Sequence, residues 1–153
     1  MIKPLARQDY RKIFNLSKKV EPFADHNFFD EFCDEIDRRR GFTIWKDGNL
    51  LGMVSFSDYI AGNLVAIHFL HDSGKPGSLT REVLRMAFTF PFCDLCLPRV
   101  MSYSIVGVTD KAGDFLLRLG FRHEGTLKEA LQLPDIRADL SIYGILKNEC
   151  RWL

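Results

Sequence analysis

The residues with the clearest chemical potential lie in a glycine-bearing turn, residues 71–77 (His-Asp-Ser-Gly-Lys-Pro-Gly). The turn follows an apolar run and precedes a helical pattern that Ser78 is expected to cap. Backbone N–H groups at a helix N-terminus attract anions, glycines allow close approach, and Lys75 adds a positive charge. The segment is therefore a candidate phosphate-binding loop. An ordinary turn before a helix is the competing interpretation.

A second candidate is the pair Cys93 and Cys96, which has the spacing of a redox motif or of half a zinc site. Zinc needs two further ligands, and the sequence has no second Cys/His pair at suitable spacing. The neighbouring residues are mostly apolar, so packing of two small side chains in a core is the preferred interpretation. We therefore expect no metal site, and a zinc or redox protein is the alternative.

Composition bounds the class of protein. The chain has 153 residues, of which 46% are hydrophobic, enough for a single domain (1–153) with a substantial core. The 21 Lys and Arg residues nearly balance the 20 Asp and Glu residues, so no overall charge draws the chain to nucleic acid or a membrane surface. No apolar run is long enough to span a bilayer, and no secretory signal is recognised. These features predict a cytoplasmic protein.

Hydrophobic periodicity predicts the elements that position these residues. The expected order, β-α-α-β-β-β-α-β-α-β-β, has an antiparallel first half followed by helical crossovers, which indicates a mixed α/β sheet with helices on its faces. An Asp47-Gly48 step predicts a hairpin turn. The predicted strands are 2–5, 41–45, 50–56, a run from Leu64, 99–106, 122–133 and 139–146, and the predicted helices end near Val20, Arg40, Phe88 and Leu119.

The second predicted helix, from about Asn27 to Arg40, is strongly amphipathic. Gly41 is expected to stop it. Its apolar side is predicted to carry Phe28, Phe29, Phe32, Cys33 and Ile36, and its acidic side Asp30, Glu31, Asp34, Glu35 and Asp37. The acidic side could attract a cationic substrate, but a solvated helix face is the preferred interpretation.

Several local patterns in the last third of the chain go together. A helix ends in Leu119-Gly120-Phe121, and the motifs Arg-His-Glu-Gly (122–125) and Leu-Lys-Glu-Ala (127–130) follow. Asp139, Tyr143, Leu146 and Glu149 follow in the last predicted strand and just after it. In these residues the chain resembles the GNAT superfamily of N-acetyltransferases, most closely the branch that acetylates ribosomal proteins and other protein N-termini. The segment 47–52 resembles the family's central strands, and the element order fits essentially the whole chain.

The resemblance implies a mostly antiparallel sheet flanked by helices and an acetyl-CoA-dependent N-acetyltransferase. Acetyl-CoA would be the cosubstrate, without a metal. The acceptor would be a primary amine, on a small molecule or a protein N-terminus, and its recognition would fall to the loop at 23–27, the second helix and residues 132–138. Nucleic acid and membrane partners are not implied, and a homodimer stays open.

The resemblance also assigns the coenzyme site. His71, Gly74 and Pro76 fall on the family's Gln/Arg-x-x-Gly-x-Gly/Ala positions, so two of three depart from the pattern. Proline lacks an N–H, for which Gly77 and Ser78 could substitute. The implied cofactor-binding residues are Phe69, Leu70, His71, Gly74, Lys75, Gly77, Ser78, Thr109 and Phe115.

For catalysis the resemblance calls for a base and an acid. His68 is the candidate base, and Tyr103 and Ser104 are candidates for the acid or for holding a water. Leu116 stands where the family often has a tyrosine, and leucine cannot donate a proton. A coenzyme-binding or protein-interaction module with weak or lost transfer is therefore the alternative.

Overall fold

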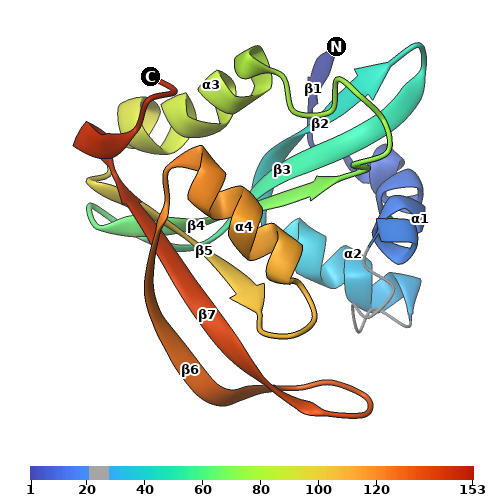
Figure 1. Cartoon of the computed structure of the whole chain (residues 1–153). Coiled ribbons are helices and arrows are strands. Elements are labelled where there is room, and N and C mark those ends of the chain that lie inside the picture. The colour runs from blue at the N-terminus through green and yellow to red at the C-terminus, as the bar shows by residue number, and fades with distance from the viewer. Residues whose placement is uncertain (21–27) are drawn as a thin grey trace. The chain divides into compact units, whose positions relative to one another are not determined.

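The computed structural model describes residues 1–20 and 28–153, and the strands of this part of the chain form one mixed sheet (Figure 1). The strand order is β1-β2-β3-β4-β5-β7-β6. The strands are β1 (Ile2–Pro4), β2 (Arg40–Lys46), β3 (Asn49–Ile60), β4 (Leu64–His71), β5 (Arg99–Ile105), β6 (Arg122–Gln132) and β7 (Arg137–Leu146). The helices are α1 (Tyr10–Val20), α2 (Phe29–Asp37), α3 (Arg81–Thr89) and α4 (Asp110–Leu119), with short helical turns η1 (Arg7–Asp9), η2 (Phe90–Asp94) and η3 (Lys147–Glu149). The predicted element order is confirmed.

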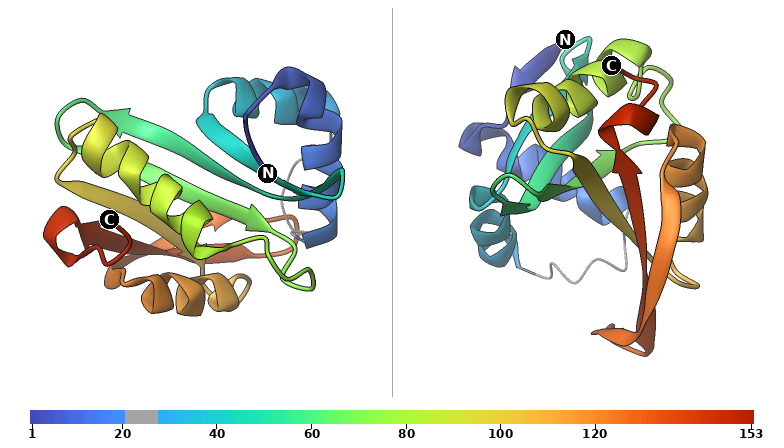
Figure 2. Two further views of the ribbon diagram at one scale, coloured as in Figure 1. Left: turned by 90° about the horizontal axis from the view of Figure 1, so that it is seen from above. Right: turned by 90° about the vertical axis from the view of Figure 1, so that its left-hand side faces the viewer.

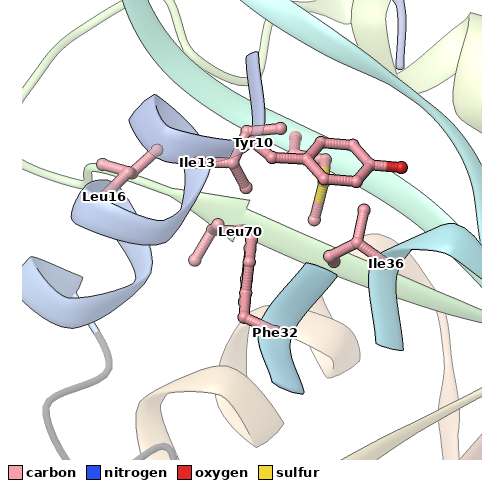
Figure 3. Close-up of a cluster of buried hydrophobic side chains, with 7 residues drawn as sticks. Tyr10, Ile13, Leu16, Phe32, Ile36 and Leu70 are labelled. Atoms are coloured by element: carbon pink, nitrogen blue, oxygen red, sulfur yellow. The ribbon is translucent and has the colours of Figure 1, made fainter. Parts of the chain in front are cut away.

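One compact unit comprises Met1–Ser57 and Ile67–Ala87. Its strands β1 and β2 pair antiparallel, as do β2 and β3. Helices α1 and α2 bury their apolar faces against β3 and β4, because each helix places apolar residues three or four positions apart. The resulting cluster is Tyr10, Ile13, Leu16, Phe32, Ile36, Met53 and Leu70 (Figure 3). This core fixes α1 beside the end of β4.

The other compact unit comprises Asp58–Ala66 and Phe88–Leu153. Here β4 pairs parallel with β5 from Leu64/Arg99 to Ala66/Met101, and β5 and β6 both pair antiparallel with β7. Residues of β5 alternate between partly exposed and buried, the pattern of a strand with one covered face. Helix α4 packs on β5, β7 and β6, and the long β6–β7 hairpin extends past it (Figures 1 and 2).

Three local predictions are wrong. Gly41 does not stop a helix, because α2 ends at Asp37 and Gly41 lies within β2. Its lack of a side chain serves packing, since an added Cβ would collide with the carbonyl oxygen of Val54. Phe28, predicted on the apolar side of this helix, lies before it and is 66% exposed. Helix α3 begins at Arg81, so Ser78 does not cap it.

The cysteine prediction is also corrected. Cys93 and Cys96 are exposed instead of packed in a core, because η2 forms a π-helical turn that directs Pro91 and Phe92 inward. The Cys96 thiol donates a hydrogen bond to the Cys93 carbonyl at 3.2 Å. Residues 1–20 and 28–153 contain no group of three or more His, Cys, Asp or Glu side chains arranged to hold a metal. Among the helices of these residues, none combines the length and hydropathy that a bilayer crossing requires.

Candidate functional site

The predicted site residues fall into two groups, and each lies within one compact unit. Residues 68–78 belong to the unit of Met1–Ser57 and Ile67–Ala87, where β4 ends and a loop leads to α3. Tyr103, Ser104, Thr109 and Phe115 belong to the unit that contains β5 and α4.

His68, the candidate base, is half-buried on β4 and contacts β3. Its Nε2 lies 2.7 Å from the hydroxyl oxygen of Ser57. In the tautomer that donates from Nε2 to Ser57, the lone pair is on Nδ1, and only a nitrogen with a lone pair can accept a proton. Ser57 therefore orients the imidazole, and in this tautomer Nδ1 is the basic nitrogen. No local sequence pattern indicates this contact, which joins residues 11 positions apart.

Phe69 and Leu70, which the resemblance assigns to the coenzyme site, lie near the end of β4. Phe69 is half-buried, whereas the Leu70 side chain packs in the core cluster of α1 and α2. The backbone of β3 approaches closely here, since a Cβ on Gly52 would lie 2.6 Å from the Leu70 carbonyl oxygen. The end of β4 is thus held by packing on its neighbours.

Asp72 organises the loop that follows β4. Its carboxylate Oδ1 accepts the Gly74 N–H at 3.1 Å, and its carbonyl oxygen accepts the Lys75 N–H at 3.0 Å. An aspartate that bonds the backbone two residues later forms an Asx turn. The Gly74 N–H, which the resemblance assigns to the coenzyme, therefore already has a partner within the loop. Lys75 itself is exposed.

The loop closes through His71 and Ser78. Ser78 is buried, with its hydroxyl oxygen 3.5 Å from His71 Nδ1. Burial lowers the pKa of His71, although the nearby Asp72 carboxylate opposes this change. His71 is therefore neutral at pH 7, unlike the arginine that the family's pattern allows at this position. Gly77 adopts φ +96°, a conformation that glycine reaches without strain.

Helix α3 receives its cap from Thr80. The Thr80 hydroxyl oxygen accepts the Val83 N–H at 3.3 Å, the usual geometry of a threonine N-cap. The helix N-terminus therefore lies two residues beyond the expected position. Gly77 and Ser78 consequently belong to the loop, and any anion bound there meets loop amides before helix amides.

In the other unit, β5 presents Tyr103 and Ser104 to opposite faces. Tyr103 is half-buried and its hydroxyl donates to Met101 Sδ at 3.8 Å. Burial, assisted by the negative charge of Asp58, raises the pKa of Tyr103. Its phenol is therefore protonated at neutral pH, as a proton donor must be. Ser104 is buried and its hydroxyl donates to the Tyr143 hydroxyl at 3.4 Å.

Thr109 and Phe115 lie at and within α4. Thr109 Oγ1 accepts the Ile105 N–H at 2.6 Å, so this side chain closes the turn from β5 to α4. Phe115 is half-buried on α4, whereas Leu116 is 2% exposed and belongs to the core. The position that often carries a tyrosine in the family is therefore filled by a packing residue.

Sequence reasoning missed three contributors to this geometry. Ser57 contacts His68, Tyr143 contacts Ser104, and Lys19 forms an ion pair with Asp72 at 2.6 Å. The Asp-Ser-Gly order of residues 72–74 is a readable sign of an Asx turn. The other contacts join distant positions and leave no local pattern. The predicted acceptor loop at 23–27 lies outside the described residues.

Comparison with known proteins shows which solved structures share this fold. No family model matches the sequence, and no curated protein does. Among solved structures, a mutant of spermidine N-acetyltransferase SpeG from Vibrio cholerae is 21% identical, with 100% of this chain and 97% of that chain covered and a TM-score of 0.80. The dodecameric structure of spermidine N-acetyltransferase from Vibrio cholerae in an intermediate state is 22% identical, with 97% and 94% covered and a TM-score of 0.75. The chain therefore has the mixed α/β fold of these N-acetyltransferases, and the predicted GNAT-like fold class is confirmed.

Proposed function

We propose that this chain is an acetyl-CoA-dependent N-acetyltransferase that transfers an acetyl group to a primary amine. The observation that carries the proposal is the match in fold to spermidine N-acetyltransferases over the whole chain, 100% covered with a TM-score of 0.80. The loop after β4 supports it, because exposed Lys75 and the open backbone at Gly77, where nothing lies within 4 Å of an added Cβ, suit a phosphate-bearing ligand. We expect the protein to act in the cytoplasm.

The proposed reaction is direct transfer. The amine nitrogen forms a bond to the thioester carbonyl carbon, the carbon–sulfur bond breaks, and the sulfur leaves with the electron pair. His68 takes the proton that the attacking nitrogen loses, and Ser57 holds its ring in place. Tyr103, kept protonated by its raised pKa, is the proposed donor to the thiolate. Backbone N–H groups of Phe69 and Leu70 would polarise the carbonyl.

For the acceptor we propose a polyamine. The matched enzymes are named for spermidine, and helix α2 of this chain presents exposed Asp30, Glu31 and Asp34, which suit a polycation. The alternative acceptor is a protein N-terminus, which is the acceptor of the branch that the sequence resembles. Because one matched enzyme is dodecameric, we also propose self-association of this chain.

A coenzyme-binding or protein-interaction module is the second candidate function. Two observations favour it: Leu116 is buried where an acid often stands, and the Gly74 N–H is occupied by Asp72. Many transfers depend mainly on proximity, so the lack of one acid lowers the expected rate without removing activity.

The test is acetyl transfer by the purified protein, with acetyl-CoA and either spermidine or an N-terminal peptide. Products are measured by mass spectrometry, because the exposed Cys93 and Cys96 would react with a thiol reagent. Acetylated spermidine supports the proposal, and an acetylated peptide without acetylated spermidine shifts it to the protein N-terminal branch. Acetyl-CoA binding without any product favours the coenzyme-binding module, and no binding at high micromolar acetyl-CoA rejects both the transferase and a coenzyme-binding role.

A further inference from the structure

The loop after β4 carries a shielded negative charge at the place where the proposed function needs to bind phosphates. The Asp72 side chain is 11% exposed, and its carboxylate holds the Gly74 N–H while the Asp72 N–H donates to the Leu51 carbonyl at 3.1 Å. These bonds fix both the carboxylate and the loop in one arrangement. A carboxylate held in the loop that binds the diphosphate would repel this ligand, unless a positive charge neutralised the carboxylate.

Lys19, near the end of α1, supplies that cancellation. Its Nζ lies 2.6 Å from Asp72 Oδ2, the oxygen that the Gly74 N–H does not use. The hydrogen bond from Lys19 is the main cause that lowers the pKa of Asp72, so the carboxylate is charged at neutral pH. His71 contributes no positive charge there, because burial lowers its pKa. Lys75 is then the remaining positive charge within segment 71–77.

We propose that Lys19 is a positioning residue for the coenzyme diphosphate: it neutralises Asp72, and Asp72 in turn shapes the loop that receives the phosphates. The inference rests on the proposed function, and it adds a residue from α1 that the sequence resemblance does not assign. The two residues have complementary roles. The carboxylate of Asp72 orders the loop backbone, and the ammonium of Lys19 reduces the repulsion between that carboxylate and the diphosphate.

Four variants separate charge from shape. Lys19→Met leaves the carboxylate uncompensated, Asp72→Asn keeps an oxygen for the Gly74 N–H but removes the charge, and the double variant removes both charges. The matched control is Lys18→Met on the same helix, because Lys18 lies 5.6 Å from the Phe14 ring centroid and has no ion pair among those found in the described residues. Dissociation constants for acetyl-CoA are measured by calorimetry at low salt, and circular dichroism confirms that each variant is folded.

We expect Lys19→Met to weaken acetyl-CoA binding about fivefold to tenfold, the effect of one unscreened charge near a protein surface. Asp72→Asn should bind at least as tightly as the wild type, and the double variant should return to within about twofold of it, since its net loop charge is unchanged. Lys18→Met should change little. The effect of Lys19→Met should shrink as salt rises.

Two results would overturn the inference while leaving the proposed function intact: equal binding by Lys19→Met and Lys18→Met, or a double variant as weak as Lys19→Met alone. The second result would mean that Lys19 acts on the ligand directly instead of through Asp72. If the wild type binds no acetyl-CoA, the proposed function fails and the inference fails with it.

Discussion

His68 is the side chain on which the proposed chemistry depends most. Replacing it by glutamine keeps a polar group of similar size but removes the basic nitrogen, so kcat/KM should fall about a hundredfold while acetyl-CoA affinity is unchanged. Ser57→Ala should have a smaller effect, about tenfold or less, because it loosens the ring without removing it. Steady-state kinetics and calorimetry measure the two quantities.

The control is His123→Gln, since His123 is an exposed residue of β6 bonded to Thr126. The pH profile gives a second readout, because the rising acid limb of kcat/KM should disappear in His68→Gln. Unchanged kcat/KM in His68→Gln would remove His68 from the mechanism.

Tyr10 gives the fold a dependence on alkaline pH. Burial, reinforced by its hydrogen bond to Asp37 at 2.9 Å, raises the pKa of Tyr10 from 10.0 to about 12. Above pH 10 the unfolded chain loses this proton first, so stability present below pH 10 is lost as pH rises toward 12. The total loss is about 2 to 3 kcal/mol for two pKa units.

Urea unfolding at pH 8 and pH 11, for the wild type and Tyr10→Phe, measures this loss. The free energy of unfolding of the wild type relative to Tyr10→Phe should fall at the higher pH. The comparison isolates Tyr10, because the other tyrosines and the lysines titrate in both proteins. A constant difference between the two proteins would contradict the assigned pKa.

For individual side chains, the sequence indicates which of them could do chemistry but not which neighbours hold them in place. Residue type and strand position indicate His68, Tyr103 and Ser104, and the alternation of β5 places Ser104 inside. Their partners Ser57, Met101 and Tyr143 come from other strands or other positions of the same strand. Such contacts depend on register and rotamer, which a single sequence does not encode locally.

Among the elements, the start of α3 is the boundary that matters for ligand binding. Thr80→Ala should destabilise the fold by about 1 kcal/mol, since it removes the cap on the Val83 N–H. Ser78→Ala should cost less, because its contact with His71 is long, at 3.5 Å. Chemical denaturation measures both values. A larger destabilisation by Ser78→Ala than by Thr80→Ala would mean that Ser78 caps the helix and that the helix begins within the loop.

The close approach of β2 and β3 at Gly41 makes a second prediction for an element. Gly41→Ala should destabilise the protein by about 2 kcal/mol or more, because the new Cβ would meet backbone atoms of Val54 and Ser55 that cannot move alone. Gly125→Ala in β6 is the matched control, since no atom outside its chain neighbours lies within 4 Å of its Cβ position. Equal melting temperatures for the two variants would contradict the packing argument.

The type of each element was predictable because hydrophobic periodicity extends over many residues of the element, whereas the ends of an element depend on single residues. Gly41 is typical of a helix stop, yet the same residue suits a crowded strand. Ser78 and Thr80 are both good caps, and only packing selects Thr80. Each error follows from a residue with two common structural uses.

For the molecule as a whole, the antiparallel pairing in the first half of the sheet and the helical crossover after β4 were predictable, because turns and crossovers constrain strand pairing. The Asp47-Gly48 turn dictates an antiparallel β2–β3 pair, and the helix between β4 and β5 permits their parallel pairing. The insertion of β7 between β5 and β6 left no local pattern and was not predicted. Compactness in two units was not predicted at all.

We predict that the chain unfolds as one cooperative domain in spite of these two units. Strands β3 and β4 each run through both units, so neither unit is a continuous piece of chain that could unfold separately. The two tryptophans allow a direct test. Trp45 is buried in the first unit, and the Trp152 indole N–H donates to the Leu119 carbonyl at 2.8 Å in the second. Trp45→Phe and Trp152→Phe each leave one reporter.

Fluorescence from either reporter should give the same thermal midpoint. Phe92→Ala, a core truncation in the second unit, should destabilise by about 3 to 5 kcal/mol and lower the midpoint reported by Trp45 in the first unit equally. A Trp45 transition that ignores Phe92→Ala would establish two independently folding units. Because the proposed base lies in one unit and the proposed acid in the other, cooperative folding would also mean that a core defect in either unit reduces the fraction of molecules able to catalyse transfer.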